Sequence, residues 1–182
     1  MQHRRHGPFR RDLPTERALK IYVMRHGPAE DQAPSGRDFD RKLTASGRLR
    51  TELVARELGR RQELPKRIMS SPLARTLETA EVVIKSLGLG LTPEHGNELA
   101  PGGNALALVR RLAAEGARRV MVVGHEPDLS RLTSKLVPTW SQGFDKAMVV
   151  ALKVQRAALI AGTTDDVAGE LRFVIEPKHL DS

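Results

Sequence analysis

The chain has 182 residues, 40% of them hydrophobic and 3% aromatic, so it is expected to fold as one domain around an aliphatic core. It contains no cysteine, which excludes a disulfide framework, a thiol nucleophile and a zinc–thiolate site. The formal net charge is +8, which favours anionic ligands. Because no zinc finger, reader helix or aromatic platform accompanies this charge, we expect no nucleic-acid partner.

The N-terminal segment differs from the rest of the chain. Residues 1–18 have no periodic apolar pattern, and Pro8 and Pro14 interrupt them. We expect a flexible basic arm over 1–18 and a single domain over 19–182. No apolar run approaches the roughly 18 residues that span a bilayer, and no apolar stretch follows the N-terminal charges as in a secretory signal. The sequence therefore predicts a cytoplasmic protein that does not associate with membranes.

The first half of this domain begins with a strand. Apolar residues over Leu19–Met24 predict that strand, and a long polar loop follows over 27–43. Thr44 can cap the next helix. The apolar side of that helix is expected to contain Leu49, Leu53, Ala55 and Leu58.

Strands and helices continue to alternate through the middle of the chain. A second strand is predicted over 66–70, and a second helix opens at Pro72 and stops at Gly88. Asn104 can cap a third helix, which ends near Gly116. A third strand over Arg118–Val123 and a fourth helix over 127–137 complete this part.

The tail is expected to contain two strands, over 146–154 and 170–175, with a polar turn around Gly162–Gly169 between them. Helices that alternate with short apolar strands are typical of an α/β domain. The sequence thus predicts a three-layer sandwich, in which helices flank a mostly parallel central sheet.

Three polar segments follow the first three predicted strands. The first contains Arg25, His26 and Gly27, the second contains Arg75, and the third contains His125. Ligands of open α/β sheets bind at the carboxyl ends of the strands, so these side chains are expected to share one site. Arginine binds two phosphate oxygens and stays charged, and a neutral imidazole is a competent nucleophile. This set therefore indicates phosphoryl transfer.

The same segments carry a family resemblance. The blocks RHGP, SSPLARTLETA and VVGHEPDLS, in this order over about Leu19 to Ile175, resemble the histidine phosphatase superfamily with its phosphoglycerate mutase-like fold. They are most similar to its short SixA-like phosphohistidine phosphatase branch. The tetrapeptide RHGP also occurs at Arg5–Pro8, but no apolar strand precedes it there, so we assign that copy no role.

The resemblance implies a role for each site residue. His26 would receive the phosphoryl group, Arg25 and Arg75 would bind its oxygens beside Gly27, and His125 would donate a further hydrogen bond. The general acid is less clearly marked: Glu98 matches best, and the rivals are Asp38 and Asp40 in the long loop. An imidazole leaves phosphorus more easily than an alkoxide does, so a poorly marked acid favours a phosphohistidine substrate.

The expected function is therefore a metal-independent phosphatase that acts on phosphohistidine, with a phosphohistidine-bearing signalling protein as partner and no cofactor. The histidines outside the site show no metal-ligand spacing, and no phosphate-binding loop of the Gly-x-x-x-x-Gly-Lys kind exists. One alternative is a phosphomonoesterase for small molecules. Another is a non-catalytic module that binds phosphate or phosphoproteins, although such a module would not need the nucleophile.

Overall fold

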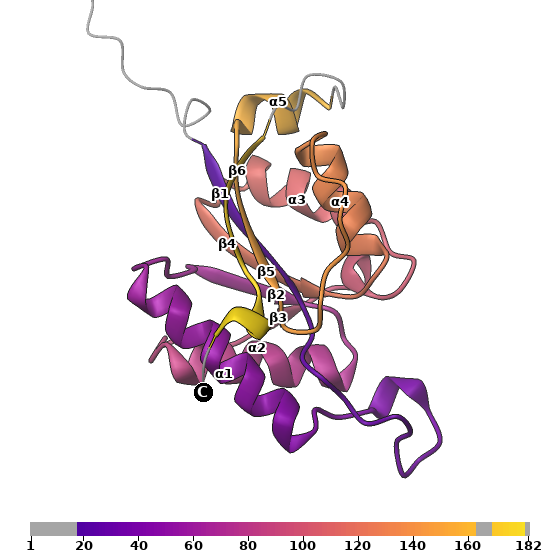
Figure 1. Cartoon of the computed structure of the whole chain (residues 1–182). Helices are drawn as coiled ribbons and strands as arrows, with labels where there is room; N and C mark the ends of the chain where they lie inside the picture. The colour runs from indigo at the N-terminus through magenta and orange to yellow at the C-terminus, as the bar shows by residue number, and fades with distance from the viewer. Residues whose placement is uncertain (1–17, 163–168, 181–182) are drawn as a thin grey trace, which may run out of the picture.

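The computed structural model describes residues 18–162 and 169–180, so most of the expected arm over residues 1–18 lies outside the described part. Its centre is a six-stranded sheet of order β3-β2-β4-β1-β5-β6 (Figure 1). The strands are β1 (Leu19–Arg25), β2 (Arg67–Ser70), β3 (Glu94–His95), β4 (Arg119–Gly124), β5 (Val149–Val154) and β6 (Glu170–Ile175). Strand β5 runs antiparallel to both of its neighbours, β1 and β6, and the other pairs of neighbouring strands are parallel, which confirms the predicted mostly parallel sheet.

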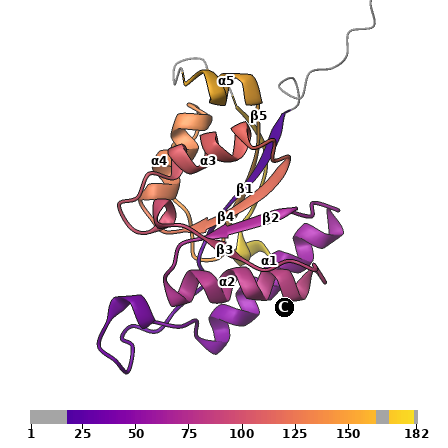
Figure 2. The ribbon, with the colours of Figure 1, turned by 180° about the vertical axis from the view of Figure 1, so that it is seen from behind.

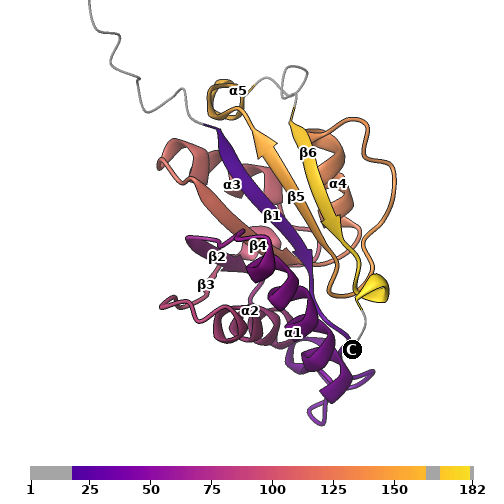
Figure 3. The ribbon, with the colours of Figure 1, turned by 60° about the vertical axis from the view of Figure 1, so that its left-hand side comes forward.

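Helices cover both faces of the sheet (Figures 2 and 3). Two of them pack on one face, α1 (Ala45–Arg60) and α2 (Ala74–Ser86). The other face is covered by α3 (Ala105–Ala114), α4 (Asp128–Leu136) and α5 (Arg156–Ala161). In the described part of the chain, three short 3-10 segments accompany these elements, η2 (Asp38–Asp40), η3 (Asn97–Leu99) and η4 (Pro177–His179). The three-layer α/β sandwich is thus confirmed.

The first strand shows why its sequence is apolar throughout. Ile21 and Val23 belong to the core under α3 and α4, while Tyr22 and Met24 belong to the core under α1 and α2. A strand covered on both faces needs apolar side chains at successive positions. None of the described helices is both long enough and apolar enough to cross a membrane.

The helix caps agree with the sequence, but the buried face of α1 does not. The Thr44 hydroxyl accepts a hydrogen bond from the Gly47 amide at 3.0 Å, and Asn104 caps α3 in the same way. Leu49, however, is 51% exposed, and Val54 is buried in its place. The prediction for Leu49 was wrong because the true buried stripe of α1 includes glycine and threonine, which an apolar pattern does not detect.

Several element boundaries also differ from the prediction. Helix α2 begins at Ala74, two residues after Pro72. Strand β5 begins at Val149 instead of Lys146. Helix α5 was not predicted, because its six residues are too few for helical periodicity to show. Part of the expected turn, residues 163–168, lies outside the described residues.

Candidate active site

The expected site residues gather at one edge of the sheet. Strands β2, β4 and β1 are parallel neighbours, so their carboxyl ends meet. The His26 amide donates to the Gly124 carbonyl oxygen at 3.2 Å, and the Ser71 amide donates to the Val123 carbonyl oxygen at 3.0 Å. The hydrogen bonds between neighbouring strands therefore continue one residue past the ends of β1 and β2. They fix the backbone from which the side chains of the site project.

The two histidines lie side by side. The ring centroids of His26 and His125 are 5.2 Å apart, with an angle of 56° between the ring planes. The residues are 7% and 4% exposed, respectively. Two imidazoles from the ends of neighbouring strands thus share one largely buried space.

A hydrogen bond defines which nitrogen of His26 can react. Its Nδ1 lies 2.7 Å from the carbonyl oxygen of Gly27. A carbonyl oxygen only accepts hydrogen bonds, so Nδ1 is the protonated nitrogen of the neutral ring. Nε2 then carries the lone pair, which is the tautomer that a nucleophile requires.

The surroundings keep both imidazoles neutral. Burial lowers the pKa of His26 to about 4, and the positive charges of Arg75, Arg25 and Lys146 act in the same direction against the Gly27 hydrogen bond. Burial also lowers the pKa of His125 to about 3, with further contributions from His26 and Arg75. At neutral pH His26 is therefore a neutral base beside cationic groups.

Both arginines are held by main-chain oxygens. Arg25 Nη1 donates to the Phe144 carbonyl oxygen at 2.6 Å, while its buried Nε has no hydrogen-bond partner in the described structure. Arg75 is 5% exposed, and its Nη1 donates to the Asp38 carbonyl oxygen at 2.8 Å. These contacts orient the guanidinium groups and leave donors for the oxygens of an anion.

The turn after β1 depends on close approach of the backbone. The Gly27 amide donates to Thr79 Oγ1 at 3.1 Å, and that hydroxyl donates to the Arg75 carbonyl oxygen at 2.7 Å. A Cβ atom on Gly27 would lie 2.7 Å from Thr51 Oγ1. Glycine is required here because α1 presses against the turn that presents His26.

The three candidates for the general acid have different partners. Asp38 Oδ2 lies 3.0 Å from Arg75 Nη2, and hydrogen bonds from Arg41 and Arg75 lower the pKa of this carboxyl group. Asp40 accepts hydrogen bonds from Ser35 and Arg37.

Glu98 is paired on the surface. Its Oε1 accepts a hydrogen bond of 2.7 Å from Arg111, which lowers the pKa of the Glu98 carboxyl group. Of the three acids, Asp38 is therefore the one in direct contact with Arg75, a residue that is expected to bind the phosphoryl oxygens.

Three further residues belong to the site, and sequence reasoning missed their contacts. Ser71 Oγ lies 2.9 Å from His125 Nε2, directly after the strand that was predicted over 66–70. Thr79 lies one helical turn after Arg75, a spacing that could have revealed it. Lys146 acts on the pKa of His26 from the segment before β5, and no sequence pattern marks it.

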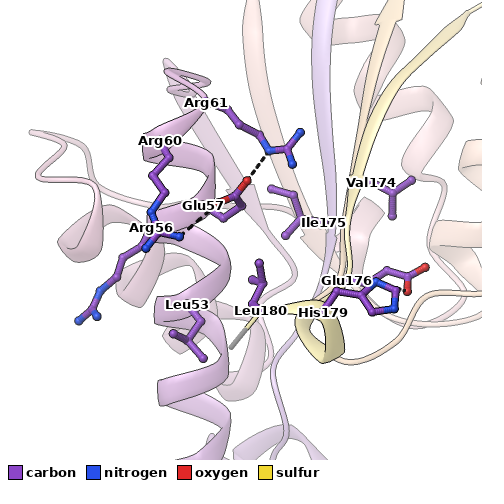
Figure 4. Close-up of a pocket in the computed structure, with 10 residues that line it drawn as sticks. All are labelled: Leu53, Arg56, Glu57, Arg60, Arg61, Val174, Ile175, Glu176, His179 and Leu180. Carbon is purple, nitrogen blue, oxygen red and sulfur yellow. Dashed lines mark hydrogen bonds and ion pairs between the residues drawn. The ribbon is translucent and has the colours of Figure 1, made fainter. Parts of the chain in front are cut away.

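Three cavities of the described structure lie away from the two histidines, and neither His26 nor His125 lines them. One cavity of about 780 Å³ lies between α1 and the end of β6 with η4 (Figure 4). Two smaller ones border Arg25, with volumes of about 340 and 490 Å³. Among residues 18–162 and 169–180, no group of three or more histidine or acidic side chains is arranged to hold a metal ion.

Comparisons with known proteins identify the family of the chain. The model of the histidine phosphatase superfamily (branch 1) matches residues 21–100, which include Arg25, His26 and Arg75. The phosphohistidine phosphatase SixA of Escherichia coli (strain K12) is 34% identical over 124 residues, which are 66% of this chain and 75% of SixA. The chain belongs to the histidine phosphatase superfamily. An uncharacterised protein of Picosynechococcus sp. is likewise 34% identical, over 89% of this chain and 99% of its own length.

Solved structures place this histidine phosphatase in the SixA-like branch. The structure of the protein histidine phosphatase SixA complexed with tungstate has a TM-score of 0.78 at 26% identity. It covers 90% of this chain and 100% of the SixA chain. Membership of the superfamily supports phosphatase activity.

Proposed function

We propose that this protein is a phosphohistidine phosphatase, which removes the phosphoryl group from a histidine of a signalling protein through a covalent intermediate on His26. The observation that carries the proposal is the neutral imidazole of His26, whose Nδ1–H is held by Gly27 while Nε2 keeps its lone pair. Similarity to SixA supports phosphohistidine as the substrate class.

The charges around His26 fit an incoming phosphoryl group. Arg25 and Arg75 would bind its oxygens and neutralise the charge that spreads over them during transfer. His125 lies beside His26 and would donate a further hydrogen bond. In the described structure Arg75 is bound by Asp38, whose side chain is 59% exposed, so that carboxylate can move away when phosphate oxygens replace it.

The reaction would proceed in two displacements at phosphorus. First, Nε2 of His26 bonds to phosphorus while the bond to the leaving imidazole nitrogen breaks; that nitrogen keeps the electron pair and takes a proton from solvent. Next, water attacks phosphorus and the bond to Nε2 breaks. The electron pair returns to His26, and the product leaves as dihydrogen phosphate. Nδ1–H remains on the Gly27 oxygen throughout.

The short segment between α2 and α3 supports a substrate on a protein. In the described chain, β3 and η3 are the only regular elements between these two helices. A small metabolite needs walls that enclose it, whereas a histidine on a protein surface needs room for its own domain. Because an imidazole is a good leaving group, this substrate also depends less on a positioned general acid.

A paired rate assay tests the proposal. Dephosphorylation of a phosphohistidine-bearing phosphotransfer domain is compared with that of p-nitrophenyl phosphate, without added metal. We expect a higher kcat/KM for the phosphohistidine protein and a loss of about a thousandfold or more in His26→Ala, because the nucleophile is gone. His95→Ala, an exposed histidine of β3, is the matched control and should retain activity.

Rapid-quench trapping with labelled substrate adds a direct readout of the intermediate. Acid-labile, base-stable label should accumulate on the wild type and on His95→Ala, and be absent from His26→Ala. Faster turnover of p-nitrophenyl phosphate would point to small phosphomonoesters as substrates. Phosphate binding without turnover of either substrate would point to a binding module.

A further inference from the structure

A second cavity adjoins the proposed reaction centre on the side of Arg25. It has a volume of about 340 Å³ and lies between the end of β1, helix α1, the segment before β5, and η4. These four parts of the chain run close together at the lower end of the sheet (Figure 3). The lining residues are Arg25, Arg50, Asp145, Lys146, Pro177 and Lys178.

The cavity has an excess of positive charge. Lys178 forms ion pairs with Asp145 at 3.6 Å and with Glu176 at 3.0 Å, so its charge is balanced locally. Arg50 and Lys146 differ: among the described residues, no hydrogen bond or ion pair engages either side chain. Together with Arg25, they leave three cationic side chains in one small space without a carboxylate bound to any of them.

The larger cavity in Figure 4 shows the contrast. Its arginines are already paired: Arg60 and Arg61 both contact Glu57, and Arg56 contacts Glu52. Ion pairs of this kind leave little attraction for a further anion. Unpaired cations in a concave site focus their field on an incoming anion. The 340 Å³ cavity beside Arg25, Arg50 and Lys146 is therefore better suited to a negatively charged group than the cavity in Figure 4.

This cavity is also linked to the nucleophile. Arg25 belongs both to its wall and to the surroundings of His26. The Ala147 amide, directly after Lys146, donates to the His26 carbonyl oxygen at 3.1 Å. Ala147 has a positive φ of 68° and is fully buried, a strained conformation that fixes how the chain leaves Lys146. An anion bound here would lie next to the phosphoryl group on His26.

We infer that this cavity is a subsite for a second anionic group of the substrate, formed by Arg50 and Lys146 beside Arg25. The inference rests on the proposed function. The ligands of the subsite are carboxylates that flank the phosphohistidine on an acidic protein surface. The carboxylate source follows from Arg25, which this cavity shares with the surroundings of His26: a group bound here belongs to the same substrate as the phosphoryl group, and the proposed function places that substrate on a protein. Such charges mainly set which partner is recognised and how fast it associates.

Matched peptides test the subsite. Two synthetic phosphohistidine peptides of equal length are compared, one flanked by aspartate and glutamate, the other by asparagine and glutamine. At low ionic strength we expect the wild type to prefer the acidic peptide by about tenfold in kcat/KM. Arg50→Gln and Lys146→Gln should each reduce this ratio by about threefold to fivefold, and added salt should reduce it in the wild type.

Arg56→Gln is the control, because it removes the same charge from an exposed position of α1 outside this cavity. Its ratio should equal that of the wild type. A wild-type ratio near one, or an equal loss in Arg56→Gln, overturns the inference. The inference is also overturned if Arg50→Gln and Lys146→Gln lower kcat/KM only for a small phosphate ester with a second anionic group, such as O-phosphoserine. The ligand of the cavity would then be a free metabolite.

Equilibrium binding of the unphosphorylated peptides separates this inference from the proposed function. Tighter binding of the acidic peptide, lost in Arg50→Gln and kept in Arg56→Gln, supports the subsite even if phosphohistidine is not hydrolysed. Equal affinity for both peptides in the wild type contradicts the subsite, whatever the hydrolysis assay gives.

Discussion

The reactivity of His26 comes from its immediate surroundings. An imidazole in water has a pKa of about 6.5 and is partly protonated at neutral pH. Burial and the nearby charges of Arg25, Arg75 and Lys146 lower the pKa to about 4, so the lone pair stays available. The same guanidinium groups are the expected ligands of the phosphoryl oxygens. One set of charges thus serves both the nucleophile and its substrate.

This lowered pKa predicts how stability depends on pH. Between pH 6.5 and 4 the unfolded chain binds protons at His26 that the folded protein does not bind, so the free energy of unfolding should fall as the pH falls through this range. His125, with a pKa of about 3, acts in the same direction. Urea unfolding at pH 7, 6 and 5 measures the slope, which should be shallower in His26→Asn.

A proton NMR titration of the His26 ring checks the cause. Its midpoint should lie below pH 5. A midpoint near 6.5 for His26 would contradict the account of its neutrality, and the phosphatase mechanism would then need another way to free Nε2.

At the scale of elements, the site depends on how closely α1 approaches the turn after β1. Thr44 caps the helix, and its amide donates to the Pro28 carbonyl oxygen at 3.1 Å. At Gly47, in the first turn of α1, an added Cβ would lie 1.9 Å from that same oxygen. The helix therefore begins in contact with the segment that holds His26, and a side chain at Gly47 would separate them.

Gly47→Ala should consequently destabilise the protein strongly. Since the obstructing atom belongs to the backbone, we expect a loss of about 3 kcal/mol or more in urea unfolding, together with reduced activity. Gly88→Ala is the comparison: it has a positive φ of 61° with open space around it, so only conformational strain of about 1–2 kcal/mol is expected. Equal losses in the two variants would contradict the packing argument.

At the scale of the whole molecule, a buried carboxylate joins parts that are distant in the sequence. Glu63, in the turn after α1, is 8% exposed. It accepts a hydrogen bond from Tyr22 in β1 and forms an ion pair of 2.5 Å with Arg172 in β6. Hydrogen bonds from Arg172 and Tyr22 lower the pKa of Glu63 to about 2. The cluster thus connects the helical layer to the centre and the edge of the sheet.

Glu63→Gln should weaken this connection in a pH-dependent way. At pH 7 we expect a loss of about 3 kcal/mol in the free energy of unfolding, because Arg172 and Tyr22 lose their charged partner. The contribution of Glu63 is fully present above about pH 4.5 and falls as the pH approaches 2, so the difference between variant and wild type should shrink there. Urea unfolding at pH 7 and pH 3 measures both values.

Glu57→Gln provides the control at this scale. Glu57 forms surface ion pairs with Arg60 and Arg61, which contribute at most about 1 kcal/mol. A difference for Glu63→Gln that is no larger than this, or that is the same at pH 3 and pH 7, would show that the cluster does not connect the layers.

The sequence by itself determined the features that follow from local pattern. Apolar runs such as Leu19–Met24 predicted the strands, and capping residues such as Thr44 and Asn104 located the starts of the helices. The segments that follow the strands contain His26, Arg75 and His125, and this placement predicted that the three side chains lie at one edge of the sheet. Each of these features depends on neighbours in the chain or on the general rule that parallel strand ends meet.

Only the tertiary structure decided what depends on contacts between distant segments. The tautomer of His26, the contact of Ser71 with His125 and the pairing of Asp38 with Arg75 all require coordinates, because no periodicity encodes them. The same is true of Lys146, which reaches the site from the segment before β5. Burial and charge act through space, so the pKa values and the cationic subsite emerge only when the layers are assembled.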